Sequence, residues 1–167
     1  TILQWLPAIE ATGTAWLSID VDSGPKSTAE LRELVRAFKT PVVIKGIMTI
    51  DDAMRCVDAG VAGIAVSNHG GRRLDHTPGT AEVLPAIAAK LKGKIPILTD
   101  GCVQSGCDVL KYLGLGADVV MVGRHVLRVK GDRQRGTQDH RCAQRHCNGP
   151  CRLCPAAGGD ACPAHGI

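Results

Sequence analysis

Residues 66–79, VSNHGGRRLDHTPG, complete an apolar run and are unusually rich in polar side chains. Within them, His69 and Arg72 lie in one glycine-flanked loop. Histidine is the usual proton carrier near neutral pH, and arginine can bind a carboxylate through two parallel hydrogen bonds. A histidine in a loop is most often an ordinary surface residue. The position at the end of an apolar run, between Ser67-Asn68 and the glycines, favours a catalytic histidine instead.

Lys45 lies near the end of another apolar run, PVVIKGI (41–47). A buried ammonium group is costly unless an anion or a polar ligand satisfies it. The alternative is a lysine whose stem lies along apolar surface while its charge reaches solvent. Reactive residues also end the other apolar runs, namely Asp20 and Asp22, Asp100, and Gly123-Arg124.

The sequences TDG (99–101) and VGR (122–124) have the features of a phosphate site. Glycine lets backbone N–H groups approach an anion, a helix N-terminus follows each sequence, and Arg124 can bind phosphate oxygens through two hydrogen bonds. The alternative is that Gly101 and Gly123 are ordinary turn glycines. Their pairing on adjacent strands, together with Arg124, favours a phosphate site.

A repeating strand–helix unit must position these residues. The predicted strands are 15–21, 41–47, 62–68, 95–101 and 117–123, and the predicted helices are 27–38, 49–60, 80–91 and 105–116. Continuous Val/Ile-rich runs indicate parallel strands buried on both faces, as in a doubly wound sheet or a TIM barrel. No G-x-G-x-x-G follows the first strand, and reactive residues end every strand, so the pattern favours the barrel.

A closed barrel has eight strands and usually about 250 residues, whereas this chain has 167. We therefore expect an incomplete α/β barrel comprising about strands 4 to 8, in residues 1–128. The first three strand–helix units and the last helix would be missing.

The composition is that of a globular protein, with 44% hydrophobic and only 2% aromatic residues, so Val, Ile, Leu and Ala must form the core. No apolar run approaches the roughly 20 residues of a membrane span, and the start lacks the pattern of a signal peptide. We expect a cytoplasmic protein without a disulfide framework. Most of the net charge of +4 comes from residues after Arg128, so the body gives no reason to expect a nucleic-acid partner.

Residues 129–167 form a tail rich in Cys, Arg, Gly and Pro, without helical apolar periodicity. Its possible zinc ligands are Cys147, Cys151, Cys154, His140 and His146. No second C-x2-C pair stands at a suitable spacing, so we expect no metal site. Two interpretations of the tail remain, disorder and a C-terminus altered by a shifted reading frame.

The segments VIKGI, VSNHGGRRLDHTPGT, ILTDG and VVMVGR together resemble the C-terminal half of the FMN-dependent α-hydroxy acid oxidases and dehydrogenases. This family includes glycolate oxidase, lactate oxidase and mandelate dehydrogenase, and the resemblance covers about residues 15–128. It implies FMN as cofactor and oxidation of an L-2-hydroxy acid to a 2-oxo acid. It also implies that the full-length protein is a homo-oligomer.

The resemblance assigns catalytic roles to the polar loop. His69 would be the base that acts at the α-hydroxy carbon, and Arg72 would bind the substrate carboxylate. Asp22 would orient the histidine and stabilise its imidazolium form, although Asp20 competes for that role.

The same resemblance assigns the cofactor contacts. Lys45 would stabilise the reduced flavin at its N1/O2 edge, Ser67 would bond the isoalloxazine, and Asp100 would hold the ribityl chain. The phosphate would be surrounded by Gly101, Cys102, Gln104, Gly123 and Arg124.

The chain departs from the family at the phosphate end. The family usually reads D-G-G-x-R where this chain reads DGCVQ (100–104), so Cys102 replaces a glycine and Gln104 an arginine. Loss of one charge-assisted contact should cost about 1.5–3 kcal/mol, roughly ten- to hundredfold in FMN affinity. His125 replaces a proline, and SGPKS (23–27) replaces a longer segment.

These departures leave two rival interpretations. One is a catalytically inactive remnant that still binds flavin or phosphate, and the other is a different phosphate-binding βα-barrel enzyme. Bound flavin without turnover would favour the remnant, and absence of flavin would favour the other enzyme.

Overall fold

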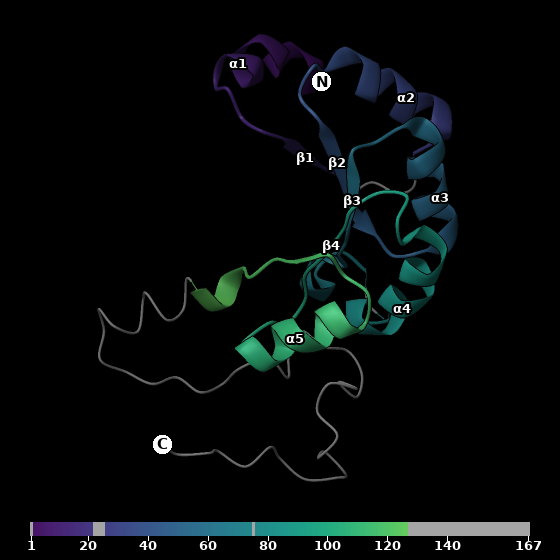
Figure 1. The fold of residues 1–167 in the computed structure, drawn as a ribbon. Helices are drawn as coiled ribbons and strands as arrows, with labels where there is room; N and C mark the ends of the chain where they lie inside the picture. Colours follow the sequence, from purple (N-terminus) through teal and green to yellow (C-terminus); the bar gives the residue numbers. More distant parts are fainter. Residues whose placement is uncertain (1, 22–25, 75, 127–167) are drawn as a thin grey trace, which may run out of the picture.

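A computed structural model describes residues 2–21, 26–74 and 76–126 of the chain (Figure 1). The elements in chain order are η1 (Ile2–Trp5), α1 (Leu6–Ala11), β1 (Leu17–Asp20), α2 (Thr28–Ala37), β2 (Val42–Ile47), α3 (Ile50–Ala59), β3 (Gly63–Val66), η2 (His69–Gly71), α4 (Thr80–Leu91), β4 (Ile97–Thr99), α5 (Gly106–Gly114) and β5 (Val119–Val120). All the strands and helices expected from the sequence are present, most of them shorter than predicted. The short helices η1 and α1 were not predicted.

The strands form one five-stranded sheet in the order β1-β2-β3-β4-β5, and every pair is parallel. In Figure 1, α2, α3 and α4 follow one another along one side of the curved sheet. A doubly wound sheet would reverse its strand order and carry helices on both faces. Sequential order with helices along one side is the arrangement of a barrel wall.

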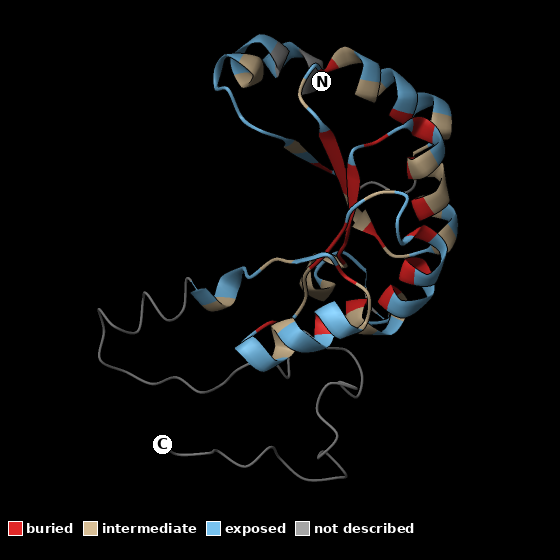
Figure 2. Ribbon diagram, viewed as in Figure 1, coloured by how far each residue is buried: buried red, intermediate tan, exposed pale blue. Residues whose placement is uncertain are grey.

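Aliphatic side chains fill the space between the sheet and the helices, where Figure 2 shows the buried residues concentrated. Ile44, Ile64 and Ile97 from the strands are almost fully buried, as are Leu84 and Leu91 of α4. A second, smaller cluster on the sheet consists of Val43, Ala65 and Leu98, with Met121 packed against it. Successive strand residues therefore enter different clusters, which explains the continuous apolar runs.

The helices α2, α3 and α5 begin at side-chain N-caps. Ser27 and Glu30 form a capping box at α2, and Ser105 and Asp108 form one at α5. Gly60 ends α3 with a φ of 80°, as expected for a glycine C-cap. The short connections hold the carboxyl ends of the strands at one edge of the sheet.

No helix in the described ranges is long and apolar enough to cross a membrane. The predicted tail (129–167), with its cysteine and histidine residues, lies outside the described residues.

Candidate functional site at the carboxyl ends of the strands

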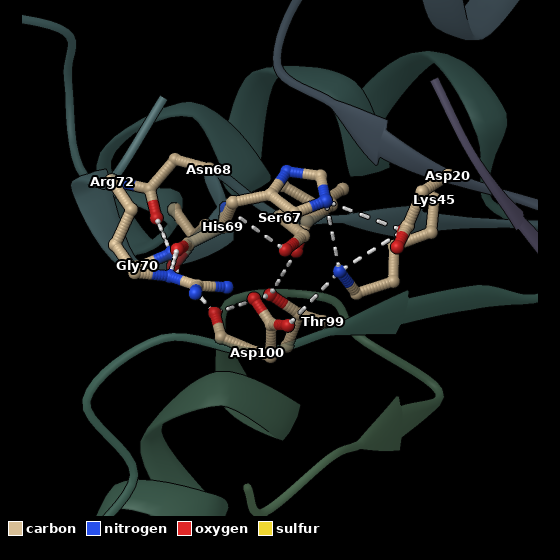
Figure 3. A network of polar contacts seen from close by, with 11 residues as sticks. Asp20, Lys45, Ser67, Asn68, His69, Gly70, Arg72, Thr99 and Asp100 are labelled. Atoms are coloured by element: carbon tan, nitrogen blue, oxygen red, sulfur yellow. Dashed lines mark hydrogen bonds and ion pairs between the residues drawn. The ribbon is translucent and has the colours of Figure 1, made fainter. Parts of the chain in front are cut away.

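Side chains from four successive strand ends meet at the centre of the site (Figure 3). Lys45 Nζ lies 3.1 Å from Asp20 Oδ1, 3.4 Å from His69 Nε2 and 4.0 Å from Asp100 Oδ2. Strand register brings the first pair together, because Asp20 stands opposite Lys45 in the β1–β2 ladder. Lys45 is only 20% exposed and lies between two carboxylates. It is therefore a central member of a polar cluster, not a lysine that extends to solvent.

His69 lies between the ammonium group of Lys45 and the carboxylate of Asp20. Its side chain is 11% exposed, and Nε2 lies 3.3 Å from Asp20 Oδ1. Ammonium can only donate a hydrogen bond and carboxylate can only accept one. A neutral Nε2 can therefore accept from Lys45, whereas a protonated Nε2 can donate to Asp20. Nε2 thus has a donor and an acceptor within hydrogen-bond distance, a geometry that suits a group that takes up and releases a proton.

The backbone of the loop after β3 is fixed by short-range hydrogen bonds. His69 has a φ of 55°, a conformation that non-glycine residues adopt mainly at turns and functional sites. Ser67 Oγ accepts from the His69 amide at 3.3 Å, and Asn68 Oδ1 accepts from the Gly70 amide at 3.0 Å. Arg72 Nε donates to the His69 carbonyl at 3.0 Å. The hydrogen bonds of Ser67 and Asn68 thus fix the backbone conformation that orients the His69 imidazole.

A cavity of about 240 Å³ opens beside this cluster. Nine of the residues predicted for the site line it, namely Lys45, His69, Arg72, Asp100, Gly101, Cys102, Gln104, Gly123 and Arg124. Ser67 is buried and is absent from the lining, so its predicted bond to the flavin stays a prediction. The cavity is smaller than the roughly 300–1,000 Å³ of most ligand pockets.

The sequence left Asp20 and Asp22 as competing partners of the histidine. Asp22 lies outside the described residues, so its role stays a prediction. Asp20 is the carboxylate whose contact with His69 Nε2 the structure describes.

The residues around the cavity suit the ribityl and phosphate groups of FMN. Asp100 Oδ1 is buried and has no hydrogen-bond partner within the described ranges, which is costly unless a ligand hydroxyl satisfies it. The guanidinium group of Arg124 lies against Gly70, where any Cβ atom would collide with it. Gly101 and Cys102 have φ values of 117° and 51°, so their peptide groups turn sharply beside the cavity. We conclude that the residues present fit the cofactor.

One expected phosphate contact is already occupied. The amide of Gln104 donates to the Asp108 carboxylate at 3.1 Å, and the amide of Ser105 donates to the same oxygen at 3.0 Å. The start of α5 thus carries its own negative cap, and the predicted contact of Gln104 with the phosphate stays a prediction. Within the described ranges, Arg124 and the peptide groups before Gln104 are better placed to bind an anion than the amide of Gln104. A Cβ atom at Gly123 would meet open space, so packing gives no reason for glycine there.

Two residues near the site were not predicted, Thr80 at the start of α4 and Tyr112 on α5. Their hydroxyl groups contact each other and the backbone of the loop after β4. The available signal was that Tyr112 is the only tyrosine of a chain poor in aromatic residues.

Comparison with known proteins supports this description. The profile of the FMN-dependent dehydrogenase family matches residues 5–139. A peroxisomal (S)-2-hydroxyacid oxidase of Arabidopsis thaliana is 48% identical over 126 residues, which are 74% of this chain and 35% of that protein. An L-lactate oxidase of Lacticaseibacillus rhamnosus is 57% identical over 84 residues, or 50% of this chain and 23% of that protein.

A crystal structure of mandelate oxidase with (S)-2-phenylpropionate superposes with a TM-score of 0.70 at 34% identity. The matched region covers 75% of this chain and 46% of that one. The chain thus spans about a quarter to a third of the length of the two curated relatives it matches.

Proposed function

Because the chain belongs to the FMN-dependent dehydrogenase family, we propose that it forms the catalytic part of an enzyme that oxidises an L-2-hydroxy acid to a 2-oxo acid. The observation that carries the proposal is the position of His69 Nε2, 3.4 Å from Lys45 Nζ and 3.3 Å from Asp20 Oδ1. We also propose that the five strands are about strands 4 to 8 of a (β/α)8 barrel, formed by residues 1–128. The cytoplasmic location and the homo-oligomer stay predictions.

The substrate carboxylate would bind Arg72, whose exposed side chain lines the cavity with His69. The neutral His69 Nε2 would take the proton of the α-hydroxyl group. Its hydrogen bond would then change from Lys45 to Asp20, and the carboxylate would stabilise the imidazolium. Lys45 remains held by Asp20 and Asp100 while this happens.

When bound, FMN supplies the acceptor for the two electrons that leave the α-carbon. Lys45 would hold the flavin ring through its ammonium group, and the buried Asp100 Oδ1 would accept from a ribityl hydroxyl. Arg124 and the peptide groups of Gly101 and Cys102 would bind the phosphate. The remaining predicted contacts, those of Ser67, Gln104 and Gly123, are kept as proposals.

Anaerobic reduction of the flavin tests the function. The full-length product of the gene is loaded with FMN and mixed with a panel of L- and D-2-hydroxy acids, and the flavin absorption band is followed. We expect bleaching by at least one L-acid and no bleaching by its D-enantiomer. Bound flavin that no acid reduces would contradict the proposal and indicate an inactive remnant. A protein that binds no flavin would indicate a different phosphate-binding enzyme.

A further inference from the structure

Two buried hydroxyl groups lie behind the loop that follows β4. Thr80, the first residue of α4, is 3% exposed, and Tyr112 of α5 is 2% exposed. Thr80 Oγ1 and the Tyr112 hydroxyl oxygen are 2.8 Å apart. Hydroxyl groups so deeply buried need hydrogen-bond partners.

The partners are two successive backbone carbonyls of the loop. Thr80 Oγ1 donates to the Asp100 carbonyl at 2.6 Å, and the Tyr112 hydroxyl donates to the Gly101 carbonyl at 2.8 Å. The packing is tight, because a Cβ atom on Gly101 would collide with Thr80 Oγ1 and lie 3.2 Å from the Tyr112 hydroxyl. Only glycine leaves room for both hydroxyl groups.

Holding these carbonyls also orients the next amides. In a planar trans peptide, the C=O group and the following N–H group point in opposite directions. The carbonyls of Asp100 and Gly101 point toward the hydroxyl pair, so the amides of Gly101 and Cys102 point away from it. Both residues line the cavity. Successive backbone N–H groups that converge on one space form an anion site.

We propose that Thr80 and Tyr112 are positioning residues that aim the amides of Gly101 and Cys102 at the FMN phosphate. This inference rests on the proposed function. The pair matters here because Gln104 carries no charge, and its amide is bonded to Asp108. The amides and Arg124 must then supply most of the phosphate binding.

The two hydroxyl groups act as a coupled unit. Each hydroxyl group has one proton to donate, so two protons are shared among three contacts: one to each carbonyl and one between the two hydroxyl groups. When either hydroxyl group is removed, the other keeps only its contact with one carbonyl. The effects of Tyr112→Phe and Thr80→Val should therefore not be additive in the double variant.

The test compares FMN with riboflavin, which lacks the phosphate, in fluorescence-quenching titrations of the full-length protein. For Tyr112→Phe and Thr80→Val we expect the Kd for FMN to rise about three- to tenfold, as for a lost neutral hydrogen bond. The Kd for riboflavin should rise less than the Kd for FMN, because riboflavin keeps the ribityl contact of Asp100 but lacks the phosphate that the amides bind. Thr80→Ser keeps the hydroxyl group, so its Kd for FMN should be close to that of the parent protein. Thr12→Val is a control away from the site, because the exposed Thr12 also bonds a backbone carbonyl but lies before the edge strand β1.

The possible failures are distinguishable. Parental FMN affinity in both hydroxyl-free variants would overturn the inference and leave the proposed function intact. Equal weakening of FMN and riboflavin would overturn it too, because that result indicates a general structural role. FMN binding by Thr80→Ser as weak as by Thr80→Val would exclude the hydroxyl as the cause. A parent protein that binds neither flavin would overturn the proposed function, and this inference with it.

Discussion

Replacing Asp20 by asparagine should slow flavin reduction by about ten- to thirtyfold. Asparagine keeps the size of the side chain but removes the charge that stabilises a protonated His69 at 3.3 Å. A hydrogen bond to a charged group contributes about 1.5–3 kcal/mol, which corresponds to roughly ten- to hundredfold in rate. Solvent reaches 47% of the Asp20 side chain, so we take the lower half of that range.

The assay is anaerobic stopped-flow reduction of the FMN-loaded protein by a saturating L-2-hydroxy acid. Asp22→Asn is the parallel variant, since the same change two residues further on tests the other carboxylate that the sequence allows. If Asp20 alone is the partner of the histidine, the Asp22 variant should react at close to the parental rate. A slow Asp22→Asn protein and a normal Asp20→Asn protein would refute the reasoning from the observed contact. Flavin absorbance must match between variants, so that lost chemistry is not confused with lost cofactor.

Four further results are expected. His69→Gln removes the proton acceptor and should lower the rate of flavin reduction by about 10²–10⁴ with flavin still bound; reduction at the parental rate would make the polar loop merely structural. Arg72→Lys keeps the charge but loses the two-pronged contact, so steady-state kinetics should show a raised KM and a lowered kcat; unchanged values would remove Arg72 from the substrate site. Gln104→Arg should tighten FMN binding by up to about tenfold in a fluorescence titration, and an equal Kd would show that residue 104 does not face the phosphate. Burial and the neighbouring Asp52 carboxylate raise the pKa of the Cys56 thiol to about 12, so iodoacetamide at pH 8 should label exposed Cys102 and leave Cys56 unlabelled until the protein unfolds; prompt labelling of Cys56 in the folded protein would contradict its burial.

The sequence was sufficient to predict which residues gather at the site. Lys45, His69 and Asp100 each follow an apolar run, and parallel strands bring their carboxyl ends to one edge. It could not decide between Asp20 and Asp22, since both lie at the end of the first run. The ladder register sets Asp20 opposite Lys45, whereas Asp22 lies outside the described residues. Register is a property of two strands and cannot be obtained from one run alone.

The hydroxyl pair was missed for a related reason. Thr80 lies 20 residues from Asp100 and 32 residues from Tyr112 along the chain. Thr80 ends the segment VSNHGGRRLDHTPGT, but the family resemblance assigned it no role, and Tyr112 lies in none of the segments that resemble the family. Only the packing of α4 and α5 against the loop brings them together. Positioning residues of this kind can be recognised only when the places of the helices on the sheet are known.

Two departures of this chain from its family, Cys102 and Gln104, fall at the phosphate end of the proposed site. The groups proposed to handle the proton, His69, Asp20 and Lys45, lie within hydrogen-bond distance of one another. Cys102 and Gln104, in contrast, alter the phosphate loop, and the Gln104 amide is bonded to Asp108. If Cys102 and Gln104 border the phosphate as proposed, these two residues weaken cofactor binding more than they alter the chemistry that would use the cofactor. Reduction rates per bound flavin should accordingly depend little on this loop, whereas the fraction of protein that carries flavin should depend on it strongly.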